Sequence, residues 1–217
     1  MGFSARWLAA AASLMIGVTI TAKDAHATSM ARLSTDQLVA ASELIVRGTV
    51  VEVWTERDDR GGIWTRAQVE VEEVFKGDAS LTAVVVDQRG GTYGGLLDQV
   101  EGAPRFSVGE ETVLFLETLR NGHTVSVGMV QGKFTVTMDP YQKKKIVQRF
   151  TTPYGSAYDG RFVPLPPAEA RVTLDTLTAA IDDAVARGWD GAPIPGVTEE
   201  RLLQVNGAPR GASTGVK

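Results

Sequence analysis

The sequence predicts a mainly β protein, folded as a small antiparallel OB-like barrel with a short N-terminal helix and one C-terminal helix. Three observations lead to this class. Apolar and polar residues alternate with a period of two through much of 44–150, turn residues separate these runs, and helical spacing returns only after 172. Changes of face within the long runs indicate β-bulges, which let strands coil around a closed core.

The first elements are a brief helix and a long strand. Ser34 or Thr35 is suited to cap the helix, which precedes a strand over 44–55. Gly48 lies inside that strand, and the apolar positions change face at Val50, so both positions indicate a bulge or bend.

The remaining strands are expected at 63–75, 81–86, 112–117, 125–129, 134–138 and 144–150. The strongest hairpin signal is Asn121-Gly122, because both residues tolerate the positive φ of a tight turn. The glycine-rich segment 89–109 is expected to form a long loop. Thr173 caps the C-terminal helix, which Gly188 ends.

The chain divides into three parts. Residues 1–27 have the pattern of a signal peptide, with an apolar run over 7–20 and Ala25-His26-Ala27 as the cleavage site. The barrel and its helices are expected over 28–188, and a flexible Gly/Pro/Ala-rich tail over 189–217. We therefore expect a secreted or periplasmic protein, without membrane insertion after cleavage.

Composition limits the function classes. The formal charge of −4 argues against a nucleic-acid partner, since phosphates attract basic surfaces. The chain has no cysteine, so the exported domain must be stabilised by its core instead of disulfides. A monomer without a cofactor is expected.

The residues give no catalytic site. His123 is the only histidine after 27, and it follows a turn with no nucleophile motif beside it. A lone histidine cannot form a zinc site, so we expect His123 to be a solvent-exposed hairpin residue and predict no metal ligands. An enzyme, in practice a hydrolase, is the least favoured class.

Three segments carry a resemblance to a known family. Residues 42–50 (SELIVRGTV), 69–77 (VEVEEVFKG) and 106–116 (FSVGEETVLFL) resemble strands of netrin-type modules, the OB-fold domains that include the tissue inhibitors of metalloproteinases. Secreted bacterial proteins of unassigned function are also similar across about 28–187. The resemblance implies a partner protein, with an exported protease as one candidate.

The resemblance also implies a mode of binding. Such inhibitors insert their first residue, a cysteine, into the protease and ligate its zinc. Thr28 lies 14 residues before Ser42, a similar spacing, but Thr28-Ser29-Met30 stands in place of the family's Cys-x-Cys. These three residues, together with Tyr93 in the glycine-rich loop and His123, are the candidate partner-binding residues.

Besides an enzyme, the sequence leaves two functions open. The leading expectation is a non-enzymatic binding protein that inhibits or accompanies an exported protease. The alternative is a glycan- or small-ligand-binding barrel, with Trp54 and Trp64 as outward-facing stacking residues. The basic run Lys143-Lys144-Lys145 has the charge to contact an acidic lipid or polysaccharide, but the favoured expectation is that it lies on a solvated sheet edge.

Overall fold

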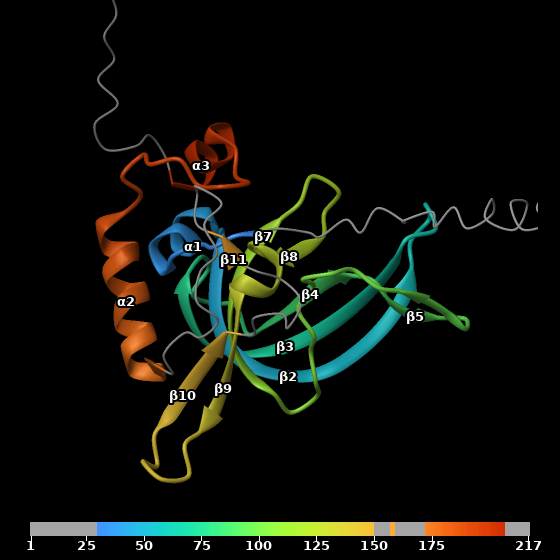
Figure 1. Ribbon diagram of the computed structural model, residues 1–217, viewed down its shortest axis with the longest axis horizontal. Helices are drawn as coiled ribbons and strands as arrows, with labels where there is room; N and C mark the ends of the chain where they lie inside the picture. The colour runs from blue at the N-terminus through green and yellow to red at the C-terminus, as the bar shows by residue number, and fades with distance from the viewer. Residues whose placement is uncertain (1–29, 150–156, 159–171, 207–217) are drawn as a thin grey trace, which may run out of the picture.

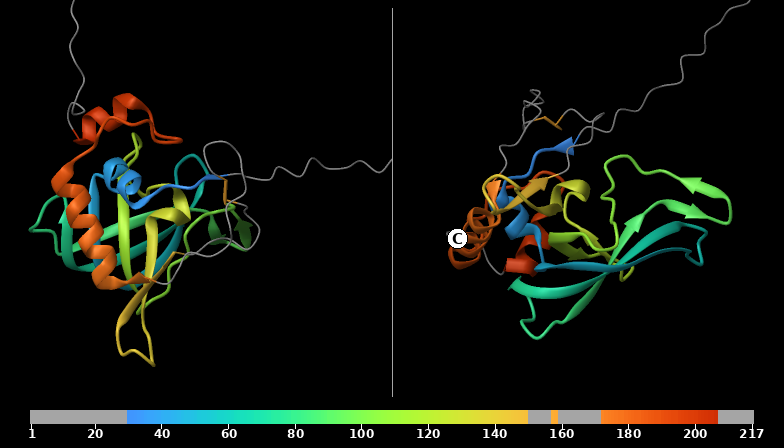
Figure 2. Two further views of the ribbon diagram at one scale, coloured as in Figure 1. Left: turned by 60° about the vertical axis from the view of Figure 1, so that its left-hand side comes forward. Right: turned by 90° about the horizontal axis from the view of Figure 1, so that it is seen from below.

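The computed structural model describes residues 30–149, 157–158 and 172–206, and it confirms a mainly β chain (Figure 1). A large antiparallel sheet forms the centre of the described part. Helices gather along one side of it, and two β-hairpins project away from the body (Figures 1 and 2). Residues 1–27, the expected signal peptide, and the candidate residues Thr28 and Ser29 lie outside the described residues.

The described elements run along the chain from β1 to α3. In sequence order they are β1 (Met30–Ala31), α1 (Thr35–Ala41), β2 (Leu44–Arg57), β3 (Ile63–Lys76), β4 (Ala83–Arg89), β5 (Gly91–Tyr93), β6 (Leu96–Asp98), β7 (Glu111–Thr118), β8 (Thr124–Ser126), a 3-10 turn (Met129–Gly132), β9 (Lys133–Met138), β10 (Lys145–Arg149), β11 (Ala157–Tyr158), β12 (Val172–Thr173), α2 (Leu174–Arg187) and α3 (Glu199–Asn206).

The large sheet runs in the order β12-β10-β9-β7-β2-β3-β4, and it branches at β7. One edge of β7 pairs with β2. Its other edge is shared, because residues 111–114 pair with β9 and residues 116–118 pair with β8. The strands β5 and β6 form a separate hairpin, and β1 pairs with β11 in parallel.

The sheet bends so strongly that β4 lies beside β8. Within the described residues, however, these two strands are not paired by backbone hydrogen bonds. We call this line the seam. One backbone N–H crosses it, from Thr124 to the Asp87 carboxylate at 3.1 Å. The expected antiparallel β class is therefore confirmed, and among the described residues the strongly bent sheet is not closed into a barrel by strand pairing.

The predicted N-terminal helix is confirmed as α1, and its cap is Ser34. The Ser34 hydroxyl accepts the Gln37 backbone N–H at 3.2 Å, and the Gln37 side chain accepts the Ser34 backbone N–H at 2.9 Å. This reciprocal pair satisfies two donors that the first helical turn leaves open. Leu38 and the residues after it in α1 are buried against the sheet.

The predicted bulges in β2 are also confirmed. Pairing with β3 shifts register between Arg47 and Gly48 and again between Val50 and Glu52. A Cβ at residue 48 would lie 2.1 Å from the backbone oxygen of Glu70, so only glycine allows this approach. The first half of the strand buries Ile45, Val46 and Val50, while beyond the second shift Val53 is only partly buried against the core.

Two apolar clusters fill the protein, one on each face of β7. The helix-side cluster includes Val113 and Phe115 with residues of α1, α2 and α3. The sheet-side cluster includes Leu114 and Leu116 with valines of β2, β3 and β4. Successive residues of a strand point to opposite faces, so β7 contributes to both clusters.

Three expected boundaries differ from the structure. The segment 89–109 contains the hairpin β5–β6 instead of one continuous loop. The strand expected over 125–129 ends at Ser126, because a 3-10 turn follows. The expected tail from 189 is packed as far as α3, since Trp189, Ile194 and Leu202 lie in the helix-side cluster.

No helix among the described residues is both long and apolar enough to cross a bilayer.

Candidate functional site

A group of interacting polar and aromatic side chains lies at the seam. Trp64 and Arg66 alternate on β3 and so share one face, and Arg66 is paired directly with Asp87 on β4. The turn between β7 and β8 brings His123 onto the same face. We call Asp58, Trp64, Arg66, Asp87 and His123 the seam cluster.

His123 is stacked on Trp64 and paired with Asp87. The two rings are 3.8 Å apart and inclined by 12°. The imidazole Nδ1 lies 3.2 Å from Asp87 Oδ2, and the His123 side chain is only 14% exposed. The expectation of a solvent-exposed hairpin histidine is thus wrong, because the indole provides an apolar surface that the turn closes over.

Asp87 joins three elements of the seam. Its Oδ2 accepts the Thr124 backbone N–H and faces His123. Its Oδ1 lies 2.9 Å from Arg66 Nε. Both of those atoms are buried, and the ion pair lacks the alignment of a good hydrogen bond. Asp87 therefore holds the β7–β8 turn against β3 and β4.

Asp58 fixes the other side of Trp64. The indole N–H donates to Asp58 Oδ2 at 2.9 Å, and the Gly62 backbone N–H donates to Oδ1 at 2.6 Å. The Trp64 bond, followed by the Gly62 bond, holds the pKa of the Asp58 carboxyl below its ordinary value. The Arg89 guanidinium lies 5.5 Å from the Trp64 ring.

The seam cluster resembles part of a catalytic site without completing one. A histidine oriented by a carboxylate can act as a general base only with a nucleophile or substrate proton within reach. Among the described residues, no hydroxyl is hydrogen-bonded to the His123 imidazole. The same described residues contain no group of three or more Asp, Glu, His or Cys side chains that could bind a metal ion. The described contacts show that the seam cluster links β3, β4 and the β7–β8 turn.

The two tryptophans proposed for stacking differ from expectation. Trp64 is 6% exposed and covered by His123, so its ring is not open to a sugar. Trp54 is half-buried, and its indole N–H donates to Glu56 at 3.3 Å. The outward-facing assignment is therefore wrong for Trp64, because the β7–β8 turn folds over that face.

The N-terminal segment is fixed to the domain without disulfides. Gln131 is buried, its Oε1 accepts the Leu33 backbone N–H at 2.8 Å, and its Nε2 donates to Ala31 O at 2.9 Å. Arg149 donates to Leu33 O at 2.9 Å. We call these contacts the Gln131 clamp. Met30, just before it, pairs with Ala157.

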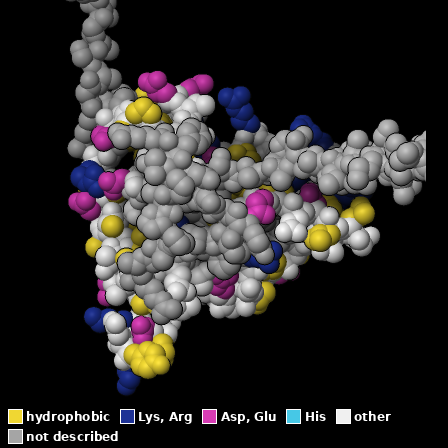
Figure 3. Space-filling model, viewed as in Figure 1, with side chains coloured by type: hydrophobic (Ala, Val, Ile, Leu, Met, Phe, Trp, Pro, Cys, Tyr) yellow, Lys and Arg dark blue, Asp and Glu magenta, His cyan; other side chains and the backbone are white. Residues whose placement is uncertain are grey.

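The β5–β6 hairpin exposes apolar side chains. Tyr93 is 44% exposed, Leu96 58% and Leu97 72%. Gly94 and Gly95 form the turn with φ of 57° and 81°, values that favour glycine. We call this the apolar hairpin tip, and yellow side chains mark it at the right of Figure 3. Sequence reasoning identified Tyr93 but missed the two leucines.

The candidate residues come from three separate parts of the chain. Met30 lies on β1, Tyr93 at the end of β5, and His123 in the β7–β8 turn. Of these, Tyr93 is the side chain whose exposure suits partner contact, while His123 is engaged in the seam cluster.

A cavity of about 370 Å³ lies between α1, the end of α2 and the segment 188–194. Its apolar wall includes Val39, Trp189 and Ile194, and Lys76 also lines it. Burial lowers the pKa of Lys76 to about 8, although the charge of Glu43 acts in the opposite direction. The Lys76 ammonium donates to Val39 O at 2.9 Å, near the end of α1.

Comparison with models of protein families gives no match, and neither does comparison with curated proteins.

Proposed function

We propose that this chain is an exported, non-enzymatic protein that binds another protein, with an exported metalloprotease as the first candidate partner. The observation that carries the proposal is the apolar hairpin tip. Tyr93, Leu96 and Leu97 are 44%, 58% and 72% exposed on one short hairpin. Tyr93 and Leu96 are paired across the hairpin and share one face, and exposed apolar groups that lie together are typical of interaction surfaces.

The geometry of the hairpin supports this role. It projects from the body at the end opposite the helices (Figures 1 and 2). At its base the Arg89 guanidinium lies 3.6 Å from the Asp98 carboxylate, and Gly90 bridges to Trp64 in the sheet. A hairpin attached in this way loses little conformational freedom on binding.

The protease is favoured by the resemblance and by the Gln131 clamp. Insertion of an N-terminus into an active site requires that the segment behind it be held in place. Contacts from Gln131 and Arg149 hold Ala31 and Leu33 without any disulfide. The lost cysteines therefore do not leave this segment unanchored.

A photocrosslinking experiment tests the binding surface. Benzoylphenylalanine replaces Leu97, and in a matched control it replaces Asp182, which is exposed on α2. In an extract of the compartment to which the chain is exported, we expect one protein to crosslink specifically at 97. The unlabelled chain should compete with it, and the double variant Tyr93→Ser, Leu97→Ser should not. Equal crosslinking at both positions would contradict the proposal.

A second experiment tests the candidate partner. Exported metalloproteases are assayed with the processed chain, with a chain carrying one extra residue before Thr28, and with Gln131→Leu. Inhibition that both changes weaken would support insertion of the N-terminus. Inhibition that is lost only in the hairpin variant would assign the contact to the apolar hairpin tip. Absence of any inhibition would remove proteases as partners.

Small-ligand binding is the second candidate function, and the cavity beside Lys76 favours it. Its volume of about 370 Å³ lies within the range of small-molecule sites. A thermal-shift screen compares the chain with Ala184→Phe, which places a ring in the cavity wall. Stabilisation of the original chain alone would support a ligand there, and absence of stabilisation by every compound would count against it.

A further inference from the structure

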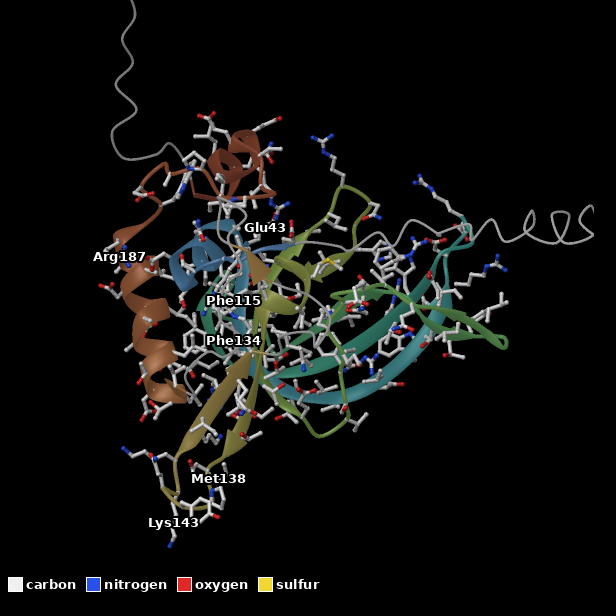
Figure 4. The ribbon with its side chains drawn as sticks, in the orientation of Figure 1. Glu43, Phe115, Phe134, Met138, Lys143 and Arg187 are labelled. Atoms are coloured by element: carbon white, nitrogen blue, oxygen red, sulfur yellow. The ribbon has the colours of Figure 1, made fainter. Side chains whose placement is uncertain are left out.

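The β9–β10 hairpin ends in a second exposed apolar group, separate from the apolar hairpin tip. Tyr141 is 95% exposed and Met138 is 59% exposed. The hairpin extends from the lower edge of the molecule, with yellow and dark blue side chains together at its end (Figure 3). Figure 4 shows Met138 and Lys143 at this end. We call Met138, Tyr141, Lys143 and Lys144 the basic tip.

The turn that presents these side chains is well ordered by hydrogen bonds. Asp139 Oδ1 accepts the backbone N–H groups of Tyr141 and Gln142 at 2.8 and 3.0 Å. The Asp139 backbone N–H donates to Lys144 O at 2.8 Å, and Lys143 N–H donates to Asp139 O at 2.9 Å. The aromatic ring is therefore held outward by its backbone, without support from neighbouring side chains.

The charge of the basic tip is opposite to that of the whole chain. Lys143 and Lys144 are exposed, and neither forms an ion pair within the described residues. Lys145 differs, since its ammonium lies 2.7 Å from Glu111 on β7. Lysines thus outnumber the single aspartate of the turn, in a chain whose formal charge is −4. The tip suits an anionic surface, which the rest of the chain would not favour.

The chemistry of the tip selects among anionic surfaces. It places two exposed lysines beside the exposed side chains of Met138 and Tyr141, whereas the apolar hairpin tip contains no lysine. A lipid headgroup layer needs no complementary pocket. Tyrosine places its ring among acyl chains and its hydroxyl among headgroups, while lysines beside it reach phosphates. An acidic polysaccharide would pair with the lysines but would not accommodate Met138.

We infer that the basic tip binds the chain peripherally to a bilayer of anionic phospholipids, with Tyr141 and Met138 at the headgroup boundary and the two lysines at phosphates. The binding is reversible adsorption, which is distinct from insertion of a spanning segment. It uses a different hairpin from the proposed protein interface, so each can fail without the other.

Vesicle flotation tests the inference on the exported, processed chain. The probes are vesicles of phosphatidylglycerol and phosphatidylcholine in equal parts, and vesicles of phosphatidylcholine alone. We expect binding only to the anionic vesicles. Replacing both lysines, as Lys143→Gln with Lys144→Gln, should weaken it about 30-fold at low salt, because each lysine near such a surface contributes about fivefold. The matched control is Arg120→Gln, an exposed cation on the β7–β8 turn, which should leave binding unchanged.

A fluorescence measurement tests the orientation. The chain has no cysteine, so Tyr141→Cys and Leu97→Cys can each carry one environment-sensitive label. Anionic vesicles should shift the emission of the label at 141 to the blue and leave the label at 97 unchanged. Equal binding to neutral vesicles, an unchanged affinity of the lysine double variant, or binding of soluble acidic polysaccharide in place of vesicles would overturn the inference.

Discussion

Replacing Lys76 by methionine is expected to flatten the dependence of stability on alkaline pH. Burial lowers the pKa of this ammonium from 10.5 to about 8 in the folded chain. Below about pH 8 the Lys76 amine is protonated in both the folded and the unfolded chain, so the folded chain is destabilised by the full cost of burying the charge. Between about 8 and 10.5 only the unfolded chain keeps the proton, so stability rises with pH across this window.

The magnitude follows from the same two values. A pKa of about 8 against 10.5 corresponds to about 3 kcal/mol at most, at about 1.4 kcal/mol per pH unit. Lys76 is only half-buried, so solvent screening reduces the expected effect to roughly 1–2 kcal/mol over the full window. The hydrogen bond to Val39 O remains in either protonation state, since a neutral amine still donates.

Urea unfolding measures this effect at neutral pH and at about pH 9.5, inside the window in which the unfolded chain binds more protons. Stability of the original chain should increase relative to Lys76→Met by about 1 kcal/mol between the two conditions. The matched control is Lys144→Met, which removes an exposed lysine at the basic tip. Parallel pH profiles for the original chain and Lys76→Met would refute the reasoning.

Three further changes test the packing. Gly48→Ala should destabilise the chain by about 3 kcal/mol, measured by urea unfolding, because its Cβ would lie 2.1 Å from Glu70 O; a loss below half that value would contradict the close approach. Gln131→Leu should cost about 2 kcal/mol and speed hydrogen exchange at the Leu33 amide, which loses its acceptor; unchanged exchange there would show that the Gln131 clamp does not hold the segment. His123→Ala should reduce the free energy of unfolding by about 1 kcal/mol. It should also let iodide quench Trp64 fluorescence, since the stacked imidazole covers the indole. Quenching equal to that of the original chain would show that His123 does not shield Trp64.

Local patterns in the sequence were enough to predict the sheet and its helices. Period-two alternation marked β3, and the Asn121-Gly122 turn marked the β7–β8 hairpin, because both signals depend on neighbouring residues only. Ser34 and Thr35 were the two candidate caps for the same reason, and Ser34 is the one that caps α1.

The seam cluster could not be predicted from local patterns. Asp87 and His123 meet only because β3 pairs with β4 in one register and β7 turns back across the same face. The packed segment after α2 was missed because Trp189, Ile194 and Leu202 reach the core singly, without a periodic spacing. The hairpin β5–β6 was missed because its strands are too short for alternation to appear.

Because the sheet branches at β7, this strand contacts more of the other strands than a simple sheet strand does: it pairs with β2, β8 and β9. It separates β8 from β9 on one edge and holds β2 on the other, while its alternating side chains enter both apolar clusters. If either apolar cluster became solvated, the buried side chains of β7 on that face would be exposed to water. The described part should therefore unfold in one step, and amide protons near Phe115 should exchange only when the whole domain opens.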